Sequence, residues 1–170
     1  GTGNFNTPYC YIDIGSSGAD YETKSTYTFT VTASDGVQST ASSTVTINIV
    51  NINDNSPQIT SANSFNANEN QTAIGTVTAT DADGDTLSFS ISGTDASSIN
   101  INSSTGVLTF VSAPNYELKS SYSIIVTASD GTNTSNQSIT VSINDVAESA
   151  PSFTSNSTFN VNENETAIGT

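Results

Sequence analysis

Positive charge is almost absent from this 170-residue chain. Two lysines stand against sixteen acidic residues and there is no histidine, so the formal net charge is −14 at pH 7. A surface that binds nucleic acid needs clustered Lys and Arg to neutralise the phosphates, and an anionic membrane would repel the chain as well. The composition therefore excludes a nucleic-acid partner and leaves cations, above all divalent metals, as the expected charged partners.

Cysteine and histidine are too scarce for several kinds of chemistry. Cys10 is the single cysteine and histidine is missing, which excludes an internal disulfide, histidine-based catalysis and a Cys/His zinc site. Because Cys10 has no histidine to activate it, we interpret it as a buried or incidental small residue rather than a nucleophile. The sequence also shows no signal peptide and no apolar run near the ~18 residues that a membrane-spanning helix needs.

What the chain does contain is an internal repeat of domain size. YETKSTYTFTVTASDG at 21–36 returns as YELKSSYSIIVTASDG at 116–131, and NENQTAIGT at 68–76 returns as NENETAIGT at 162–170. Shifts of 95 and 94 residues indicate an array of domain-sized units rather than a solenoid of short ones. We therefore expect the C-terminal part of one repeat plus a linker at 1–56, a complete repeat at 57–150, and the N-terminal start of a third at 151–170.

The periodicity within the repeat is that of β-strands throughout. Apolar residues recur at every second position over residues 122–128 and 139–143, and the copy upstream does the same over 27–33 and 45–49. The residues between them are Ser, Thr and Asn, apart from Ile125. Alternation of this kind is typical of half-buried strands. Two more strands are predicted, one at 87–91 and one that carries Ile74, Val77 and Ala79. Clusters of Gly, Asn, Asp and Ser separate these runs at intervals of about ten residues, which predicts a sandwich of about seven strands.

The acidic residues fall at strand ends, in loops and in linkers rather than along the strands. Loops from alternate strand ends of a sandwich gather at one pole or the other, where several carboxylates without cations repel one another. A hard cation that takes about 6–8 oxygen ligands would remove this repulsion, and calcium fits better than magnesium, which keeps its waters. Taken alone, the residues leave open that these are ordinary turn residues on a very acidic protein.

Six short motifs lie in register along the complete repeat and its following linker, and NINDNSP at 51–57 precedes them. The motifs are NEN at 68–70, TDADGD at 80–85, ININSSTGVLTF at 99–110, PNYE at 114–117, VTASDG at 126–131 and DVAESAP at 145–151. Together they resemble the cadherin domain, or the cadherin-like modules of bacterial surface proteins. NINDNSP matches the cadherin linker pattern D-x-N-D-N-x-P at all but its first position, which is Asn51 here. The resemblance implies an all-β fold of tandem Greek-key β-sandwiches with an immunoglobulin-like architecture.

The resemblance also implies calcium ions at the junctions between consecutive repeats, held from three directions. At the first junction the preceding repeat would supply carboxylates, the linker would supply side-chain and backbone oxygens, and the following repeat would reach back with three carboxylates. Asp85 would contribute to this site or shape its loop. In that order, the implied residues are Asp20 and Glu22; Asn53, Asp54 and Asn55; and Asp81, Asp83 and Asp130.

The second junction departs further from the family pattern. Glu69, Glu117 and Asp145 stand at expected positions, but Asn115 replaces an Asp before the YE pair. In the linker, Ala147 replaces an Asn and Glu148 replaces an Asp, and the DxD of the next repeat would lie beyond residue 170. We therefore expect this junction to bind fewer ions, or to bind them more weakly.

Three classes of function remain. The favoured one is a calcium-rigidified repeat of a cell-surface or secreted adhesin, whose partners are calcium, neighbouring repeats, and other cell-surface proteins or glycans. Homophilic binding rests on the family resemblance alone. The alternative is a spacer or carbohydrate-binding module of a secreted polysaccharide-active enzyme, although the chain has no Trp for an aromatic platform. An enzyme is not expected, because the acids show metal-ligand spacing and no pocket-lining constellation accompanies them.

Overall fold

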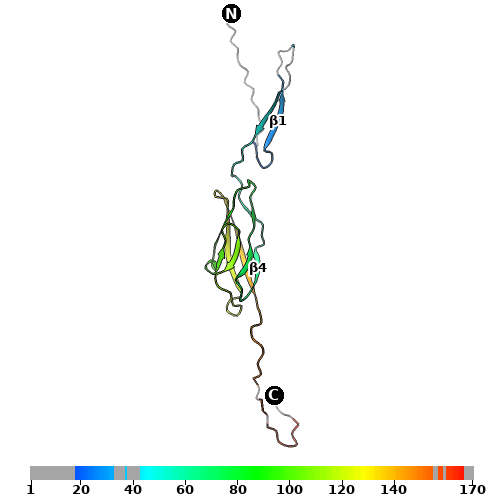
Figure 1. Cartoon of the computed structure of the whole chain (residues 1–170), viewed down its shortest axis with the longest axis vertical. Helices are drawn as coiled ribbons and strands as arrows, with labels where there is room; N and C mark the ends of the chain where they lie inside the picture. Colours follow the sequence, from blue (N-terminus) through cyan, green and yellow to red (C-terminus); the bar gives the residue numbers. More distant parts are fainter. Residues whose placement is uncertain (1–17, 33–36, 38–42, 155–156, 159, 167–170) are drawn as a thin grey trace.

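The computed structural model describes residues 18–32, 37, 43–154, 157–158 and 160–166, which are built almost entirely of β-strands and connecting loops (Figure 1). The long axis of the molecule follows the order of the sequence, with a hairpin, a sandwich and an extended tail one after another. Within the described part, no helix is long and apolar enough to cross a membrane. Cys10 and Ala33 lie outside the described residues.

The upstream hairpin consists of β1 (Thr26–Val31) and β2 (Ser43–Asn48), which pair antiparallel. Tyr27 lies opposite Ile47 and Phe29 opposite Val45, so the predicted apolar alternation lines one face of the pair. This confirms the two predicted strands within the described residues. Ile49 falls outside β2, although its backbone N–H still donates to the carbonyl oxygen of Ser25 at 2.8 Å.

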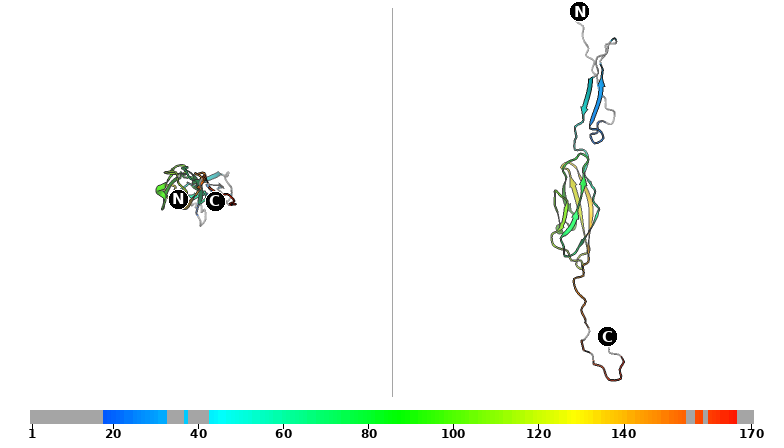
Figure 2. Two further views of the ribbon diagram at one scale, coloured as in Figure 1. Left: turned by 90° about the horizontal axis from the view of Figure 1, so that it is seen from below. Right: turned by 45° about the vertical axis from the view of Figure 1, so that its right-hand side comes forward.

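The sandwich, β3 to β11, has two principal sheets that face each other (Figures 1 and 2). The four-stranded sheet has the order β4-β11-β10-β7, in which β4 runs parallel to β11, and the three-stranded sheet has the order β5-β9-β8. A short pair, β3 and β6, completes it. The elements are β3 (Gln58–Ile59), β4 (Ser64–Asn68), β5 (Ala73–Thr76), β6 (Ala79–Thr80), β7 (Ser88–Ser92), the 3-10 helix η1 (Ala96–Ser98), β8 (Ile99–Ile101), β9 (Val107–Phe110), β10 (Ser121–Ser129) and β11 (Thr134–Asn144).

The core lies between the two sheets and consists of the alternate residues of each strand. Ile124 and Val126 of β10 meet Leu108 of β9 there, and all three are fully buried. Each such side chain contributes about 1.5–3 kcal/mol when it leaves water. Ser, Thr and Asn occupy most of the intervening positions, as expected for a solvated sheet face, and Val107 and Ile125 are exposed apolar exceptions. Because β10 and β11 run the length of the sandwich, the loops at their ends mark its two poles.

The prediction of a single strand over residues 74–79 is wrong. Ile74, Val77 and Ala79 were expected on one strand, but β5 ends at Thr76 and β6 begins at Ala79, with Val77 buried between them. Gly106 lies directly beside Val77: its φ is +70°, and a Cβ there would lie 2.2 Å from the Val77 carbonyl oxygen. The Val77 N–H donates to the Gly106 carbonyl oxygen at 2.9 Å, which extends the contact between β5 and β9 by one residue. β3 and β4 also belong to different sheets: β3 pairs with β6, whereas β4 pairs with β11 in the four-stranded sheet.

Candidate metal-binding poles

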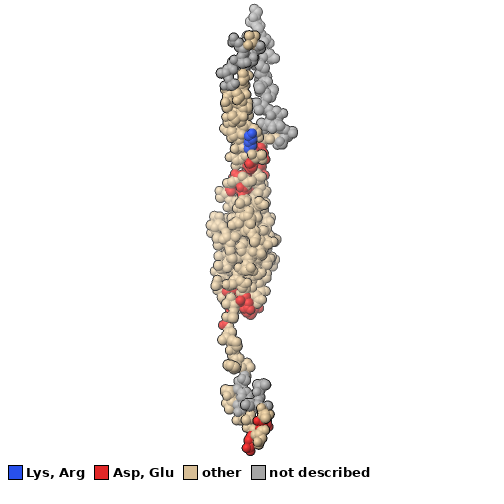
Figure 3. All heavy atoms as spheres, turned by 90° about the vertical axis from the view of Figure 1, so that its right-hand side faces the viewer, with Lys and Arg blue, Asp and Glu red and all other residues tan. Residues whose placement is uncertain are grey.

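The acidic residues of the sandwich gather at its two ends. Figure 3 shows the Asp and Glu side chains at both poles, with uncharged residues over the face between them. The first pole faces the upstream hairpin and contains Asp81, Asp83 and Asp130, together with the linker Asn51–Pro57. The second pole, at the opposite end, contains Glu69, Glu117 and Asp145. Among the described residues, three groups of carboxylates have oxygens within 4.8 Å of one another: Glu22, Asp54 and Asp83; Asp81, Asp83 and Asp85; and Glu69, Glu117 and Asp145.

Asp83 accepts most of the hydrogen bonds that the linker donates to the sandwich. The backbone N–H groups of Asp54 and Asn55 donate to its Oδ2 at 3.2 and 2.8 Å, and the Asn55 side-chain amide donates to its Oδ1 at 3.0 Å. Asn51 adds a hydrogen bond from its Nδ2 to the Asp83 carbonyl oxygen at 2.8 Å. The Asn55 amide is the main reason why the pKa of Asp83 lies below its usual value, against the opposing effect of burial.

Asp81 shapes the loop that carries Asp83. Its Oδ1 accepts from the backbone N–H groups of Asp83 and Asp85 at 3.0 and 3.2 Å, and Gly84 provides the positive φ of +79° that the turn requires. The other oxygen, Oδ2, is buried and has no hydrogen-bond partner. A buried carboxylate oxygen without a donor is uncommon in folded proteins and calls for an ion or water.

Asp130 repeats this arrangement at the loop between β10 and β11. Its Oδ1 accepts from the backbone N–H groups of Thr132 and Asn133 at 2.7 and 2.6 Å, and its Oδ2 is buried without a partner. Burial raises the pKa of Asp130, but the hydrogen bonds from the backbone N–H groups of Asn133 and Thr132 outweigh this effect, so the pKa is lowered overall. Two carboxylates of the first pole therefore each keep one buried oxygen unused.

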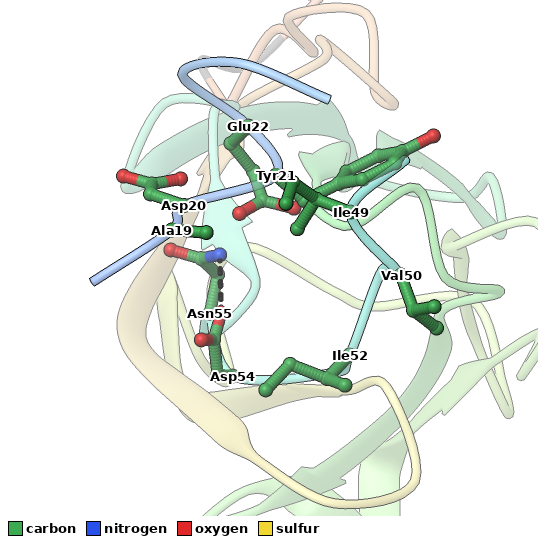
Figure 4. Close-up of a pocket in the computed structure, with 9 residues that line it drawn as sticks. All are labelled: Ala19, Asp20, Tyr21, Glu22, Ile49, Val50, Ile52, Asp54 and Asn55. Carbon is green, nitrogen blue, oxygen red and sulfur yellow. Dashed lines mark hydrogen bonds between the residues drawn. The ribbon is translucent and has the colours of Figure 1, made fainter. Parts of the chain in front are cut away.

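Glu22 is the upstream residue that reaches the first pole. Its carboxylate has an oxygen within 4.8 Å of those of Asp54 and Asp83. Glu22 and Asp54 also line a hollow of about 410 Å³ between the hairpin side and the linker (Figure 4). Its own backbone N–H lowers the pKa of Glu22, but burial and the neighbouring Asp83 carboxylate outweigh this and raise it. Like charges therefore meet at this contact.

Asp20 also lines the hollow (Figure 4), but both of its oxygens are engaged within its own turn. Oδ1 accepts from the Thr23 backbone N–H at 3.1 Å and Oδ2 from the Thr23 hydroxyl at 2.9 Å. These hydrogen bonds, the backbone one first, lower the pKa of Asp20. Asp20 belongs to none of the three close carboxylate groups of the described residues, but its carboxylate interacts with that of Glu22, so the structure places it at the edge of the cluster.

Asn133 is a residue of the first pole that the sequence reasoning missed. Its Nδ2 donates to the side-chain oxygen of Asn53 at 2.9 Å and to the backbone oxygen of Asn55 at 3.2 Å. Next to it, the Ser135 hydroxyl donates to the Pro57 carbonyl oxygen. The only sequence signal was an amide residue three positions after Asp130, in ASDGTN.

The second pole is built around Glu69, which is buried with 1% of its surface exposed. Its Oε2 accepts from the Tyr116 backbone N–H at 2.9 Å and its Oε1 from the Val146 N–H at 2.7 Å. These two donors, Tyr116 first, lower the pKa of Glu69 although burial acts to raise it. Unlike Asp81 and Asp130, Glu69 therefore has a backbone partner for each oxygen.

The departures from the family pattern are visible at this pole. The side-chain oxygen of Asn115 accepts from the Leu118 N–H at 2.8 Å, in the same turn that Asp20 and Thr23 form one repeat earlier. Glu148 accepts a hydrogen bond from the Asn70 side-chain amide, and Ala147 offers no side-chain oxygen. Asn115 therefore serves a turn, and Glu148 is already engaged with the sandwich.

Comparisons with known proteins agree with the predicted resemblance. Residues 63–144 match the family model described as Cadherin domain. Among solved structures, protocadherin gammaB7 EC3–6, described as a cis-dimer, is 29% identical, with 74% of this chain and 34% of that chain covered and a TM-score of 0.67. Protocadherin gamma B2 extracellular cadherin domains 3–6 are 26% identical, with coverage of 75% and 34% and a TM-score of 0.68.

These matches confirm the resemblance for residues 63–144 and the all-β sandwich fold. The chain spans about a third of the length of these two solved chains, at 34% of each. A search of curated proteins returned no match.

Proposed function

From the premise that residues 63–144 form a cadherin domain, we propose that the chain is a calcium-rigidified repeat module of an extracellular adhesin. The proposal places it at the cell surface or in a secreted protein, in contact with neighbouring repeats and with other cell-surface proteins or glycans. Support comes from the similarity to extracellular cadherin domains of protocadherins and from carboxylates gathered at the poles. The proposed division of the chain is 1–56, 57–150 and 151–170.

The observation that carries the proposal is the pair of buried, unpartnered oxygens at the first pole. Oδ2 of Asp81 and Oδ2 of Asp130 have no hydrogen-bond donor, in a chain whose net charge is −14. A cation with all-oxygen coordination satisfies such atoms and offsets the repulsion among the neighbouring carboxylates. The donor set therefore fits calcium.

The residues that would hold calcium at the first junction come from three segments. The hairpin side offers Glu22, with Asp20 beside it; the linker offers Asp54 and the oxygens of Asn53 and Asn55; the sandwich offers Asp81, Asp83 and Asp130. At the second junction Glu69, Glu117 and Asp145 would contribute to a weaker site. The weaker binding follows because Glu69 already has two backbone donors and Glu148 is engaged by Asn70.

Calcium would supply positive charge between the acidic hairpin side and the first pole, and the residues that hold it would then fix the hairpin side relative to the sandwich. Without it, Glu22 repels Asp54 and Asp83, so the hairpin side and the sandwich tend to separate. Extracellular calcium modules work at Kd values of about 10⁻⁴–10⁻³ M. At ten times Kd, each independent site would add roughly 1.4 kcal/mol to the ordered state, which is enough to matter and weak enough to be reversible.

The test is small-angle X-ray scattering on the chain in calcium and in excess chelator, with a melting curve in each condition. We expect calcium to lengthen and stiffen the particle and to raise the melting temperature. Magnesium at the same concentration is the control, since it prefers fewer protein ligands and retains its waters. If neither shape nor melting temperature responds to calcium, the proposal fails and the acidic clusters are solvated turns.

A further inference from the structure

Three asparagine side chains join the linker to the sandwich without any metal. Asn51 donates to the Asp83 backbone at 2.8 Å, Asn55 to the Asp83 carboxylate at 3.0 Å, and Asn133 to Asn53 and Asn55 at 2.9 and 3.2 Å. Asn133 is the member that the sandwich itself contributes, next to β11. It is half-buried. Its own backbone N–H donates to Asp130 Oδ1 at 2.6 Å, and this hydrogen bond fixes the backbone position from which the side chain extends toward the linker.

The linker makes attractive contacts on its sandwich side and repulsive contacts on its hairpin side. On the sandwich side, N–H groups meet carbonyl and carboxylate oxygens, and such contacts are attractive without an ion. On the hairpin side, the Glu22 carboxylate meets those of Asp54 and Asp83, and such contacts are repulsive until a cation is present. Loss of the cation should therefore release the hairpin side while the linker stays on the sandwich.

We propose that Asn133 is a positioning residue for the first junction, which holds the linker in its ion-binding conformation before the ion arrives. The proposal rests on the calcium function above. A carbonyl oxygen has two lone pairs, so the oxygens of Asn53 and Asn55 can accept from Asn133 and still face a cation. An ion that meets an ordered linker avoids the conformational entropy of ordering it, which costs about 1–2 kcal/mol per residue for the backbone.

The experiment compares Asn133→Ala with the unsubstituted chain, both made in a host without N-glycosylation because Asn133-Thr134-Ser135 is an acceptor sequence. In excess chelator, hydrogen exchange at the Asp54 and Asn55 amides, which donate to Asp83, should become several-fold faster. Calcium affinity by calorimetry should fall by about tenfold, the lower end of what outer-shell partners cost. The melting temperature in chelator should stay close to that of the unsubstituted chain.

The matched control is Asn136→Ala, because Asn136 is an exposed β11 asparagine whose side-chain oxygen accepts from Thr127 and which has no recorded contact with the linker. Asn136→Ala should change neither the hydrogen exchange of the Asp54 and Asn55 backbone amides nor the calcium affinity. Asn133→Ser, too short to reach Asn53, should repeat the effect of Asn133→Ala and replaces it if the alanine variant does not fold.

Unchanged exchange at Asp54 and Asn55 would overturn the proposal, and so would a rise in calcium affinity, which would mean that the amide competes with the ion. If the unsubstituted chain binds no calcium, the proposed function fails. The exchange experiment in chelator then still decides whether Asn133 holds the linker.

Discussion

Both poles of the sandwich carry a group of carboxylates, but the two groups are used differently. At the first pole, Asp81 and Asp130 each spend one oxygen on a turn and leave the other buried and unpartnered. At the second pole, Glu69 is almost fully buried, yet both of its oxygens accept from backbone N–H groups. We therefore expect dependence on metal to follow the unused acceptor capacity of buried oxygens rather than acidic clustering alone.

A second difference lies in the linkers. Asn51–Pro57 is tied to the first pole by amide donors, whereas Ala147 and Glu148 replace the corresponding amide and carboxylate at the second junction. The first junction should therefore depend on calcium, and the second should depend mainly on Glu69 and its two amides. Four predictions test this contrast, in order of decreasing effect.

The largest effect is expected from Asp54→Ala. It removes the linker carboxylate closest to Glu22 and Asp83, and a direct ligand should cost more than the ~10–100-fold that outer-shell partners cost in metal affinity. Its counterpart, Glu148→Ala, should change calcium affinity by less than about fivefold, which corresponds to the ~1 kcal/mol of an exposed charge pair. Calorimetric titration of both variants measures the contrast. Equal losses in the two variants would remove the asymmetry between the junctions.

The second effect concerns stability without calcium. Glu69→Gln replaces one acceptor oxygen with an NH₂ group, so either Tyr116 or Val146 loses the acceptor for its backbone N–H. We expect the melting temperature in chelator to fall by about 5 °C or more. Glu117→Gln is the control, since that residue belongs to the same carboxylate group but is exposed. A fall of similar size in both variants would mean that the group acts by charge rather than through the hydrogen bonds of Glu69.

Glu69 should also make the stability of the sandwich depend on pH. The pKa of Glu69 is lowered from 4.5 in the folded state, so its carboxylate contributes stability above about pH 4.5 and this contribution is lost as the pH falls through the folded pKa. Melting curves in chelator between about pH 6 and pH 3 should therefore fall less steeply for Glu69→Gln than for the unsubstituted chain. Parallel curves would show that Glu69 does not carry this share of acid sensitivity.

The sequence predicted those features that follow from periodicity and from repeated motifs. Alternation located β10 and β11, and the motifs grouped Glu22 with Asp54 and Asp83, which the structure brings within 4.8 Å. The path of single side chains could not be predicted. Asp20 accepts from Thr23 within its own turn, and Val77 lies between β5 and β6 beside Gly106. The motif spacing encodes neither the local donor that Asp20 takes nor the contact between the segments of Val77 and Gly106.

The smallest effect is expected from Asp95, between β7 and η1, which tests whether charge outside the poles matters to the comparison. Asp95 accepts from the Ser123 N–H at 2.8 Å and forms an ion pair with Lys119, whose side chain is 43% exposed. Lys119 also lies over the Tyr122 ring, 4.7 Å from its centroid, so it keeps a partner when the carboxylate is removed. Asp95→Ala should therefore cost the sandwich less than about 1 kcal/mol of stability from the ion pair and leave calcium affinity unchanged in the titration that separates Asp54→Ala from Glu148→Ala. A large loss of affinity would mean that charges beside the β7–η1 loop act on the junctions, and the poles could then no longer be treated as separate sites.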